Sequence, residues 1–66
     1  MIIPKGWPEV QETALQEWLN TRSPDYLMLR RDSRELIVDR RRGDLLAFMD
    51  VDGRCFVHPD FRSQIV

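Results

Sequence analysis

The sequence has few of the features that stabilise very small proteins or mark them for export. It has 66 residues and a single cysteine, Cys55, so no disulfide can form within the chain. The longest apolar run, Leu45 to Met49, is far too short to cross a bilayer, and residues 1–7 lack the extended apolar segment of a signal peptide. We therefore expect one small domain, residues 1–66, that resides in the cytoplasm and has no membrane partner.

A basic excess is also missing. The chain carries 10 lysines and arginines against 11 acidic residues, which gives a formal net charge of -1. Proteins dedicated to binding duplex nucleic acid usually show a strongly basic footprint. Arginines are nevertheless concentrated between Arg30 and Asp44, and this stretch requires an explanation of its own.

Catalytic and metal-binding motifs are sparse. Cys55 and His58 lie three residues apart on an expected strand, which places their side chains on opposite faces and prevents a nucleophile and base pair. Cys55 is expected to be a small core residue. The segment His58 to Asp60 could supply two metal ligands, but no second histidine or partner cysteine completes a site. We expect no enzymatic activity, no metal and no cofactor, and no motif is specific enough to indicate a family.

The N-terminal part of the chain predicts an amphipathic helix from Pro8 to Thr21. Proline suits a first helical position, and acidic residues at 9 and 12 are favourable near a helix N-terminus. Apolar residues recur at spacings of three and four, which is typical of a helix with one buried face. They are Trp7, Val10, Ala14, Leu15, Trp18 and Leu19. Ser23-Pro24 is expected to end the helix.

Four short apolar runs follow, separated by charged or glycine-containing breaks. Such runs between turn residues predict strands. The first two are expected to form a hairpin that turns at Asp32-Ser33 and places Arg30 opposite Glu35. The last two are expected to form a hairpin with a three-residue turn from Val51 to Gly53. The sequence thus predicts an α+β fold in which the N-terminal helix packs on one face of a four-stranded antiparallel meander.

A second fold remains open at this point. Residues 24–42 also carry a helix start near Ser23 to Asp25 and a helix end at Arg40 to Gly43. This alternative has two helices followed by a β-hairpin. It is less favoured, because the apolar residues of this stretch spread around the whole circumference of a helix.

The alternation along the strands predicts two unlike faces. An aliphatic face is expected to lie under the helix and comprises Leu27, Leu29, Leu36, Val38, Leu45, Ala47, Met49, Cys55 and Val57. The second face is expected to have an apolar centre of Met28, Ile37, Phe48 and Phe56 with a polar rim. Because such a composition is typical of protein interfaces, we expect this face to bind protein.

The expected function is therefore that of a non-enzymatic protein-binding module, such as an inhibitor, an adaptor or a regulatory subunit. Its partner would be another protein or a second copy of the chain, as a homodimer. The expected interface residues are Tyr26, Met28, Arg30, Ile37, Leu46, Phe48, Arg54, Phe56 and His58. In a competing interpretation the tails cover this face, since they contain Ile2, Ile3, Ile65 and Val66.

An alternative function is the binding of single-stranded nucleic acid on the same face, where aromatic rings would stack on bases and Arg30 and Arg54 would contact phosphates. Carboxylates at 35, 39 and 50 make this function less favoured, because they would lie beside the phosphates. The run of three arginines is expected to keep a loop soluble and to guard strand ends. Phosphate contacts are the second interpretation of this region, and they would involve Arg22, Arg40, Arg41 and Arg42.

Overall fold

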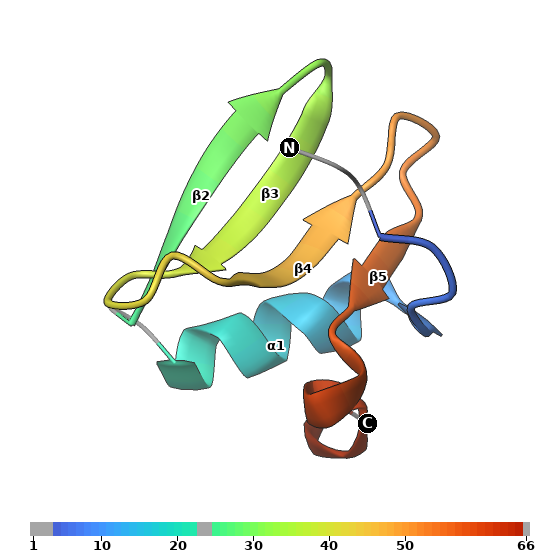
Figure 1. The fold of residues 1–66 in the computed structure, drawn as a ribbon. Helices are drawn as coiled ribbons and strands as arrows, with labels where there is room; N and C mark the ends of the chain where they lie inside the picture. The colour runs from blue at the N-terminus through green and yellow to red at the C-terminus, as the bar shows by residue number, and fades with distance from the viewer. Residues whose placement is uncertain (1–3, 23–24, 66) are drawn as a thin grey trace.

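The computed structural model describes residues 4–22 and 25–65 and shows an α+β fold (Figure 1). One antiparallel sheet has the strand order β1-β5-β4-β3-β2, and the helix α1, Glu12–Arg22, lies across one of its faces. The remaining elements are β1 (Glu9–Val10), β2 (Tyr26–Arg31), β3 (Arg34–Asp39), β4 (Leu45–Met49), β5 (Cys55–Val57) and the 3-10 helix η1 (Pro59–Gln64). The expected meander is confirmed with one additional strand, and the alternative with two helices before a hairpin is wrong.

The additional strand replaces the first turn of the expected helix. The carbonyl of Pro8 accepts a hydrogen bond of 3.1 Å from the N–H of Val57, and Val10 lies opposite Cys55 in the β1–β5 ladder. The β-branched side chain of Val10 is 9% exposed, and such side chains fit a pleated, half-buried surface. β1 also pairs backbone groups of β5 that would otherwise lack partners. For these reasons the helix begins at Glu12 and not at Pro8.

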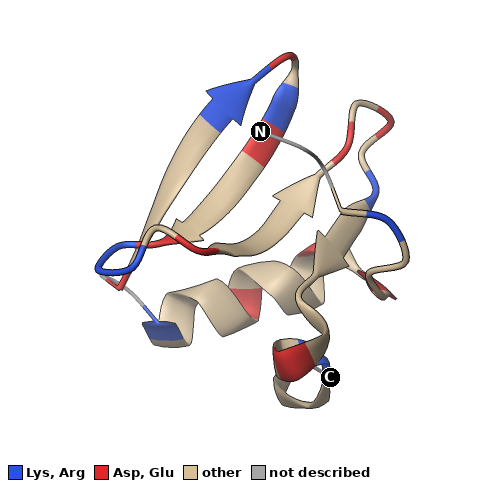
Figure 2. Ribbon diagram, viewed as in Figure 1, with Lys and Arg blue, Asp and Glu red and all other residues tan. Residues whose placement is uncertain are grey.

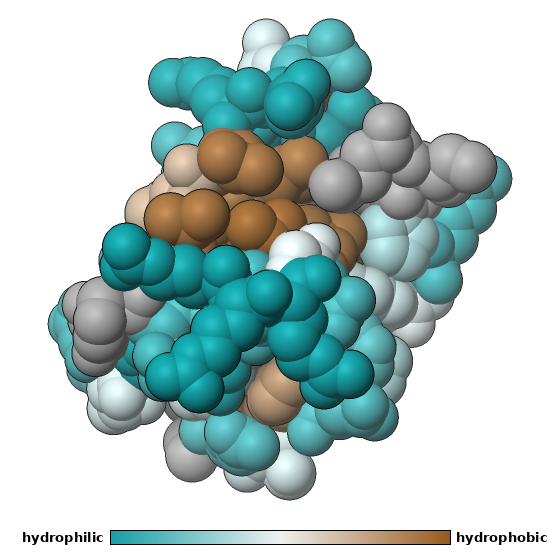
Figure 3. Space-filling model, turned by 60° about the vertical axis from the view of Figure 1, so that its left-hand side comes forward, coloured by the Kyte–Doolittle hydropathy of each residue, from teal (hydrophilic) through white to brown (hydrophobic). Residues whose placement is uncertain are grey.

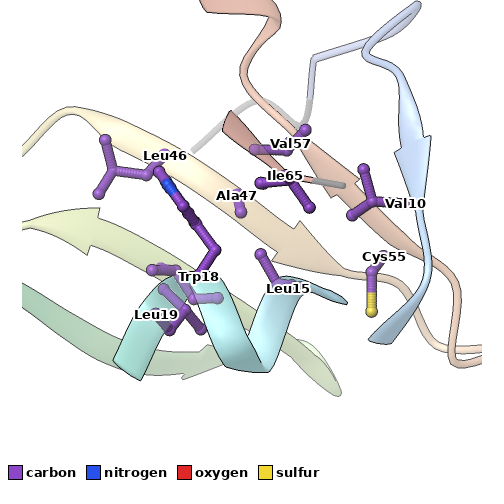
Figure 4. Packing of buried hydrophobic residues seen from close by; sticks show 10 residues of the cluster. Val10, Leu15, Trp18, Leu19, Leu46, Ala47, Cys55, Val57 and Ile65 are labelled. Carbon is purple, nitrogen blue, oxygen red and sulfur yellow. The ribbon is translucent and has the colours of Figure 1, made fainter. Parts of the chain in front are cut away.

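The main core lies between α1 and the sheet. Leu15, Trp18 and Leu19 recur at spacings of three and four and are all buried, so they form the stripe that faces the sheet. Figure 4 shows them packed with side chains of the central strands and of the C-terminal segment. Those partners are Val10, Ile37, Leu46, Ala47, Cys55, Val57 and Ile65. Burying one large aliphatic side chain contributes about 1.5–3 kcal/mol, so this cluster is a major source of stability.

The register of each hairpin is set by its turn. Asp32 and Ser33 have φ angles of 51° and 66°, the pattern of a two-residue type I′ turn, whose twist matches that of the flanking strands. Arg30 consequently lies opposite Glu35, as expected. In the second hairpin Gly53 has a φ of 88° and donates its N–H to the carbonyl of Asp50 at 3.0 Å. The predicted three-residue turn is therefore confirmed.

Candidate functional site

The two hairpins join in the opposite sense to that expected. Within each hairpin the predicted pairing is correct, although Leu46 lies in the helix-side core with Ala47 and not on the face of Phe48. The strands β3 and β4, however, pair so that Ile37 lies opposite Ala47 and Leu36 lies opposite Phe48. Ile37 belongs to the helix-side core and is 3% exposed. The expected apolar centre of Met28, Ile37, Phe48 and Phe56 is therefore wrong as a single surface, because its members lie on both faces of the sheet.

A register shift close to the connection from β3 to β4 explains this inversion. The carboxylate of Asp39 accepts hydrogen bonds of 2.8 Å from the N–H groups of Arg41 and Arg42, and its carbonyl accepts one of 2.8 Å from Gly43. The N–H groups of Arg42 and Arg41 hold the pKa of Asp39 below its ordinary value, because they stabilise the ionised carboxylate. The ladder then shifts its register between Ile37 and Val38. A shift of one residue moves a strand's side chains to the opposite face.

The face opposite α1 is covered by the N-terminal segment. Trp7 was expected beneath the helix, but its ring lies 5.8 Å from that of Phe48 on the other side of the sheet. Phe48 stacks on Phe56 at 5.1 Å and is only 3% exposed. Residues 4–7 line a shallow hollow with these two rings. This part of the predicted binding face is consequently not an open surface, and Phe48 presents no free ring on which a base could stack.

The N-terminal and C-terminal tails therefore pack on opposite sides of the sheet. Residues 4–7 lie on the face opposite α1, where the interpretation with covering tails places the N-terminal tail. Ile65 instead packs into the helix-side core and is 2% exposed. The other tail residues named for this role, Ile2, Ile3 and Val66, lie outside the described residues.

Exposed apolar side chains are concentrated on the edge strand β2. Among the described large apolar residues, Leu27, Met28 and Leu29 are 44%, 49% and 39% exposed, and only Val51, at the tip of a turn, is exposed besides them. Figure 3 shows an apolar band across this flank of the molecule, with hydrophilic residues on both sides. We refer to Leu27, Met28 and Leu29 as the β2 patch.

The position of β2 explains why the patch stays open. The hairpin of β2 and β3 rises away from α1, so the helix covers the central strands and not this edge (Figure 1). Met28 lies directly opposite Ile37, yet Met28 is half exposed and Ile37 is buried. Tyr26, at the start of the strand, still packs against the core. The edge of the sheet thus presents apolar side chains on both of its faces.

Charged residues bound the β2 patch at each end (Figure 2). Arg30 and Arg31 follow it, and Arg34 lies opposite Arg31 across the turn. The Nε of Arg34 is 3.0 Å from Oδ1 of Asp50. The pKa of Asp50 is lowered, chiefly because the N–H of Val51 donates to its carboxylate and additionally because of Arg34.

The other end of the patch combines acidic and basic groups. Asp25 precedes β2, and its carbonyl accepts a hydrogen bond of 3.0 Å from the N–H of Arg40. The loop of three arginines also lies at this end, between Asp39 and Asp44 (Figure 2). Acidic residues also lie at the first end, where Asp32 is in the turn and Glu35 lies opposite Arg30, so both ends of the patch carry mixed charge.

The remaining predicted interface residues are dispersed. Leu46 is 3% exposed and belongs to the helix-side core. Arg54 is exposed, and its Nε lies 3.4 Å from Oδ2 of Asp52. The ring of His58 lies 5.1 Å from that of Trp7, and its Nδ1 accepts a hydrogen bond of 3.0 Å that caps η1. The structure therefore brings together at the surface only those predicted residues that belong to β2, namely Tyr26, Met28 and Arg30.

The residues proposed for phosphate contacts also separate into two groups. The guanidinium of Arg22 lies 5.0 Å and 5.2 Å from the ring centroids of Trp18 and Phe61, and its Nε is buried without a hydrogen-bond partner. Residues 40–42 form the exposed loop, in which Arg42 lies 3.5 Å from Asp44. Arg22 is thus held on aromatic rings and does not extend with the loop toward solvent.

The groups with catalytic potential take structural positions. Cys55 is 1% exposed, and burial raises the pKa of its thiol, so it carries the features of a core residue and not of a nucleophile. His58 lies outside the helix-side cluster that contains Cys55. Within residues 4–22 and 25–65, no group of three or more His, Cys, Asp or Glu side chains is placed to hold a metal ion. In the same part of the chain, no helix is long and apolar enough to span a membrane.

The fold and site thus define a small α+β domain with an exposed apolar edge strand. No protein-family model matches the chain, and no curated protein or solved structure is significantly similar to it. The function must therefore be argued from the site.

Proposed function

We propose that this chain is a non-enzymatic, cytoplasmic protein-binding module, an inhibitor, adaptor or regulatory subunit, that binds its partner through the β2 patch. One observation carries this proposal. Three consecutive apolar residues are exposed on the longest free edge of the sheet, while the apolar side chains of the neighbouring strand β3 are buried. Contiguous exposed apolar surface of this kind marks interaction sites in small proteins.

The edge position adds a second source of affinity. A strand at the edge of a sheet presents unpaired N–H and C=O groups, and natural proteins usually protect such strands with charges, prolines or bulges. The central residues of β2 carry none of these protections. A partner strand that adds to this edge gains main-chain hydrogen bonds, and the patch side chains supply apolar contacts.

Arginines beside the patch support recognition of a particular partner. Arg30 and Arg31 are exposed immediately after the apolar residues. Charges at the rim of an interface contribute to register and association rate more than to affinity. The arrangement of apolar patch and flanking charge therefore suits selective binding to a protein surface.

The proposal is tested by site-specific cross-linking in cells that express the chain. A benzophenone amino acid replaces Leu27 in one version and Val51 in another, and cross-linked products are identified by mass spectrometry. Both positions are exposed and apolar, but Val51 lies outside the patch. We expect a discrete protein cross-link from position 27 and none from position 51. The product from position 27 should disappear when Leu29→Asp is added.

Two results would overturn the proposal. One is equal or absent cross-linking from both positions. The other is saturable binding of a single-stranded oligonucleotide to the purified chain that weakens steeply with added salt and with Arg30→Ala, because this outcome indicates the nucleic-acid alternative.

A further inference from the structure

We infer that the occupant of the β2 edge is a second copy of this chain, which adds its own β2 in an antiparallel register centred on Met28. The resulting sheet is continuous across two protomers. This inference rests on the proposed function, because it names the partner of the same surface.

The backbone of β2 has the hydrogen-bond pattern that this register needs. Arg31 and Arg34 flank the two-residue turn, and such a closing pair is hydrogen-bonded; bonded and non-bonded pairs then alternate along the hairpin. The bond of 3.0 Å from the Arg40 N–H to the Asp25 carbonyl follows the same alternation. Odd-numbered residues of β2 therefore bond to β3, and even-numbered residues direct their backbone groups to the open edge. They are Tyr26, Met28 and Arg30.

A register centred on Met28 uses all of these groups. Met28 lies opposite the partner's Met28, and Tyr26 lies opposite the partner's Arg30. Each becomes a hydrogen-bonded pair of the new ladder, because all three residues direct N–H and C=O outward. A register centred on Leu27 or Leu29 pairs fewer of the outward groups. The pattern of the backbone thus favours the Met28 centre.

Charge complementarity favours the same arrangement. In an antiparallel pair centred on Met28, Asp25 lies opposite the partner's Arg31, and this occurs twice because the arrangement is two-fold symmetric. Opposite charges that face each other across strands are favourable, and like charges are unfavourable. A parallel pair would instead place Arg31 beside the partner's Arg31. The distribution of charge along β2 therefore selects the antiparallel pair.

The side chains of the patch are also self-complementary. Leu27 lies opposite the partner's Leu29, so an apolar pair forms on the far face on each side of the two-fold axis. On the helix side, Tyr26 and the partner's Arg30 can form a cation–π contact. Pairing thus covers side chains that are 39–49% exposed in the single chain.

The arginine loop does not oppose this arrangement through its overall charge. Residues 40–42 lie at the end of β2 that meets the partner's hairpin tip, where the arginines lie among Asp32, Glu35 and Asp50. Asp25, Asp39 and Asp44 lie at that end and offset most of the positive charge of the loop and of Arg22. The approaching tip therefore brings acidic as well as basic groups to a region of mixed charge.

Position 28 provides the sharpest test, because in this register it contacts itself. We would measure sedimentation equilibrium of the wild type, of Met28→Lys and of Met28→Glu over a wide concentration range. The wild type should dimerise, and each variant should dimerise about tenfold more weakly, since it places two like charges opposite each other. An equimolar mixture of the two variants should regain association, because lysine then faces glutamate.

The same substitutions at Val51 are the matched control, since Val51 is exposed but lies in the turn between β4 and β5 and not on the edge strand β2. Val51→Lys and Val51→Glu should leave the dimer unchanged. A wild type that stays monomeric at all concentrations would overturn the inference. A dimer that tolerates both Met28 variants would overturn this register.

Amide hydrogen exchange supplies an independent readout. With rising protein concentration, the amides of Tyr26, Met28 and Arg30 should become protected, while those of Leu27 and Leu29 are already protected in the monomer. Protection that does not depend on concentration would contradict the pairing. If the wild type is monomeric while position 27 cross-links to a different protein, the inference fails and the proposed function stands. If position 27 gives no cross-link, both fail.

Discussion

At the scale of single residues, a chain of aromatic contacts links the two sides of the sheet. Trp7 contacts Phe48 and His58, and His58 contacts Phe61 at 5.8 Å. Phe61 in turn lies 5.4 Å from Trp18 in the helix-side core. Aromatic pairs contribute about 0.5–1.5 kcal/mol each beyond the area they bury. A substitution of one of these rings should therefore alter the packing on both faces of the sheet.

Phe48→Asp distinguishes the structure from the expectation based on sequence alone. The sequence predicts that Leu36→Asp unfolds the chain and that Phe48→Asp leaves it folded but unable to associate. Because Phe48 is 3% exposed and Leu36, which lies opposite it on the face away from α1, is 1% exposed, we expect both variants to unfold. Even Phe48→Ala should cost about 3–5 kcal/mol, a large part of the stability of a domain of this size.

Circular dichroism with urea denaturation measures this loss. Met28→Lys is the comparison variant and should keep a native spectrum, because its side chain is half exposed. A cooperative, native-like transition for Phe48→Asp would show that the far face is not packed as described.

The lowered pKa of Asp39 predicts acid sensitivity with a definite sign. A carboxyl whose pKa is lower in the folded state stabilises the fold above its ordinary pKa of about 3.9, and this stabilisation is lost as the pH falls through the folded value. The urea midpoint of the wild type should therefore fall between pH 5 and pH 2. Asp39→Asn should have a lower midpoint than the wild type at pH 7 and a smaller fall on acidification. An unchanged fall in Asp39→Asn would contradict this role.

At the scale of elements, the hairpin of β2 and β3 depends on an unusual turn. Asp32 and Ser33 both adopt the left-handed backbone region that glycine and asparagine tolerate best. Both strands continue directly from this turn, so its geometry fixes which residues of β2 reach the patch.

Ser33→Gly should stabilise the chain. Relief of the left-handed conformation is worth about 1–2 kcal/mol, and the additional freedom of glycine in the unfolded chain offsets about 0.5–1 kcal/mol of it. The net gain should be a few tenths to about 1 kcal/mol by urea denaturation. Ser63→Gly is the matched control in η1, where φ is not positive, and should destabilise. A loss of stability in Ser33→Gly would mean that the serine side chain itself holds the turn.

Local patterns predicted each hairpin, because turn residues and strand alternation determine a register over a few positions. The way in which the hairpins join was not predictable in the same manner. It depends on a shift between Ile37 and Val38 that has no distinct sequence pattern. The segment from Pro8 to Val10 carries good signals for a helix start, yet pairing with β5 outweighs them. Consequently, the face assignment of Ile37 and Trp7 was wrong although the fold class was correct.

At the scale of the whole molecule, the exposed edge follows from the size of the chain. A domain of about 60 residues buries only about 60% of the surface that its unfolded chain exposes. Here α1 covers one face of the central strands, and residues 4–7 cover part of the other. The elements placed in this way leave β2 open, and this is the surface that the inferred dimer would cover.

The pairing of β1 with β5 has a consequence for synthesis on the ribosome. Val10 completes its ladder only with Cys55, and α1 packs against Ile65 near the other end of the sequence. While residues 55–65 are still inside the ribosome, the nascent chain contains α1 and the strands β2, β3 and β4 but no partner for β1. The core therefore closes only after residues 55–65 emerge, and until then the apolar face of the helix is accessible to chaperones.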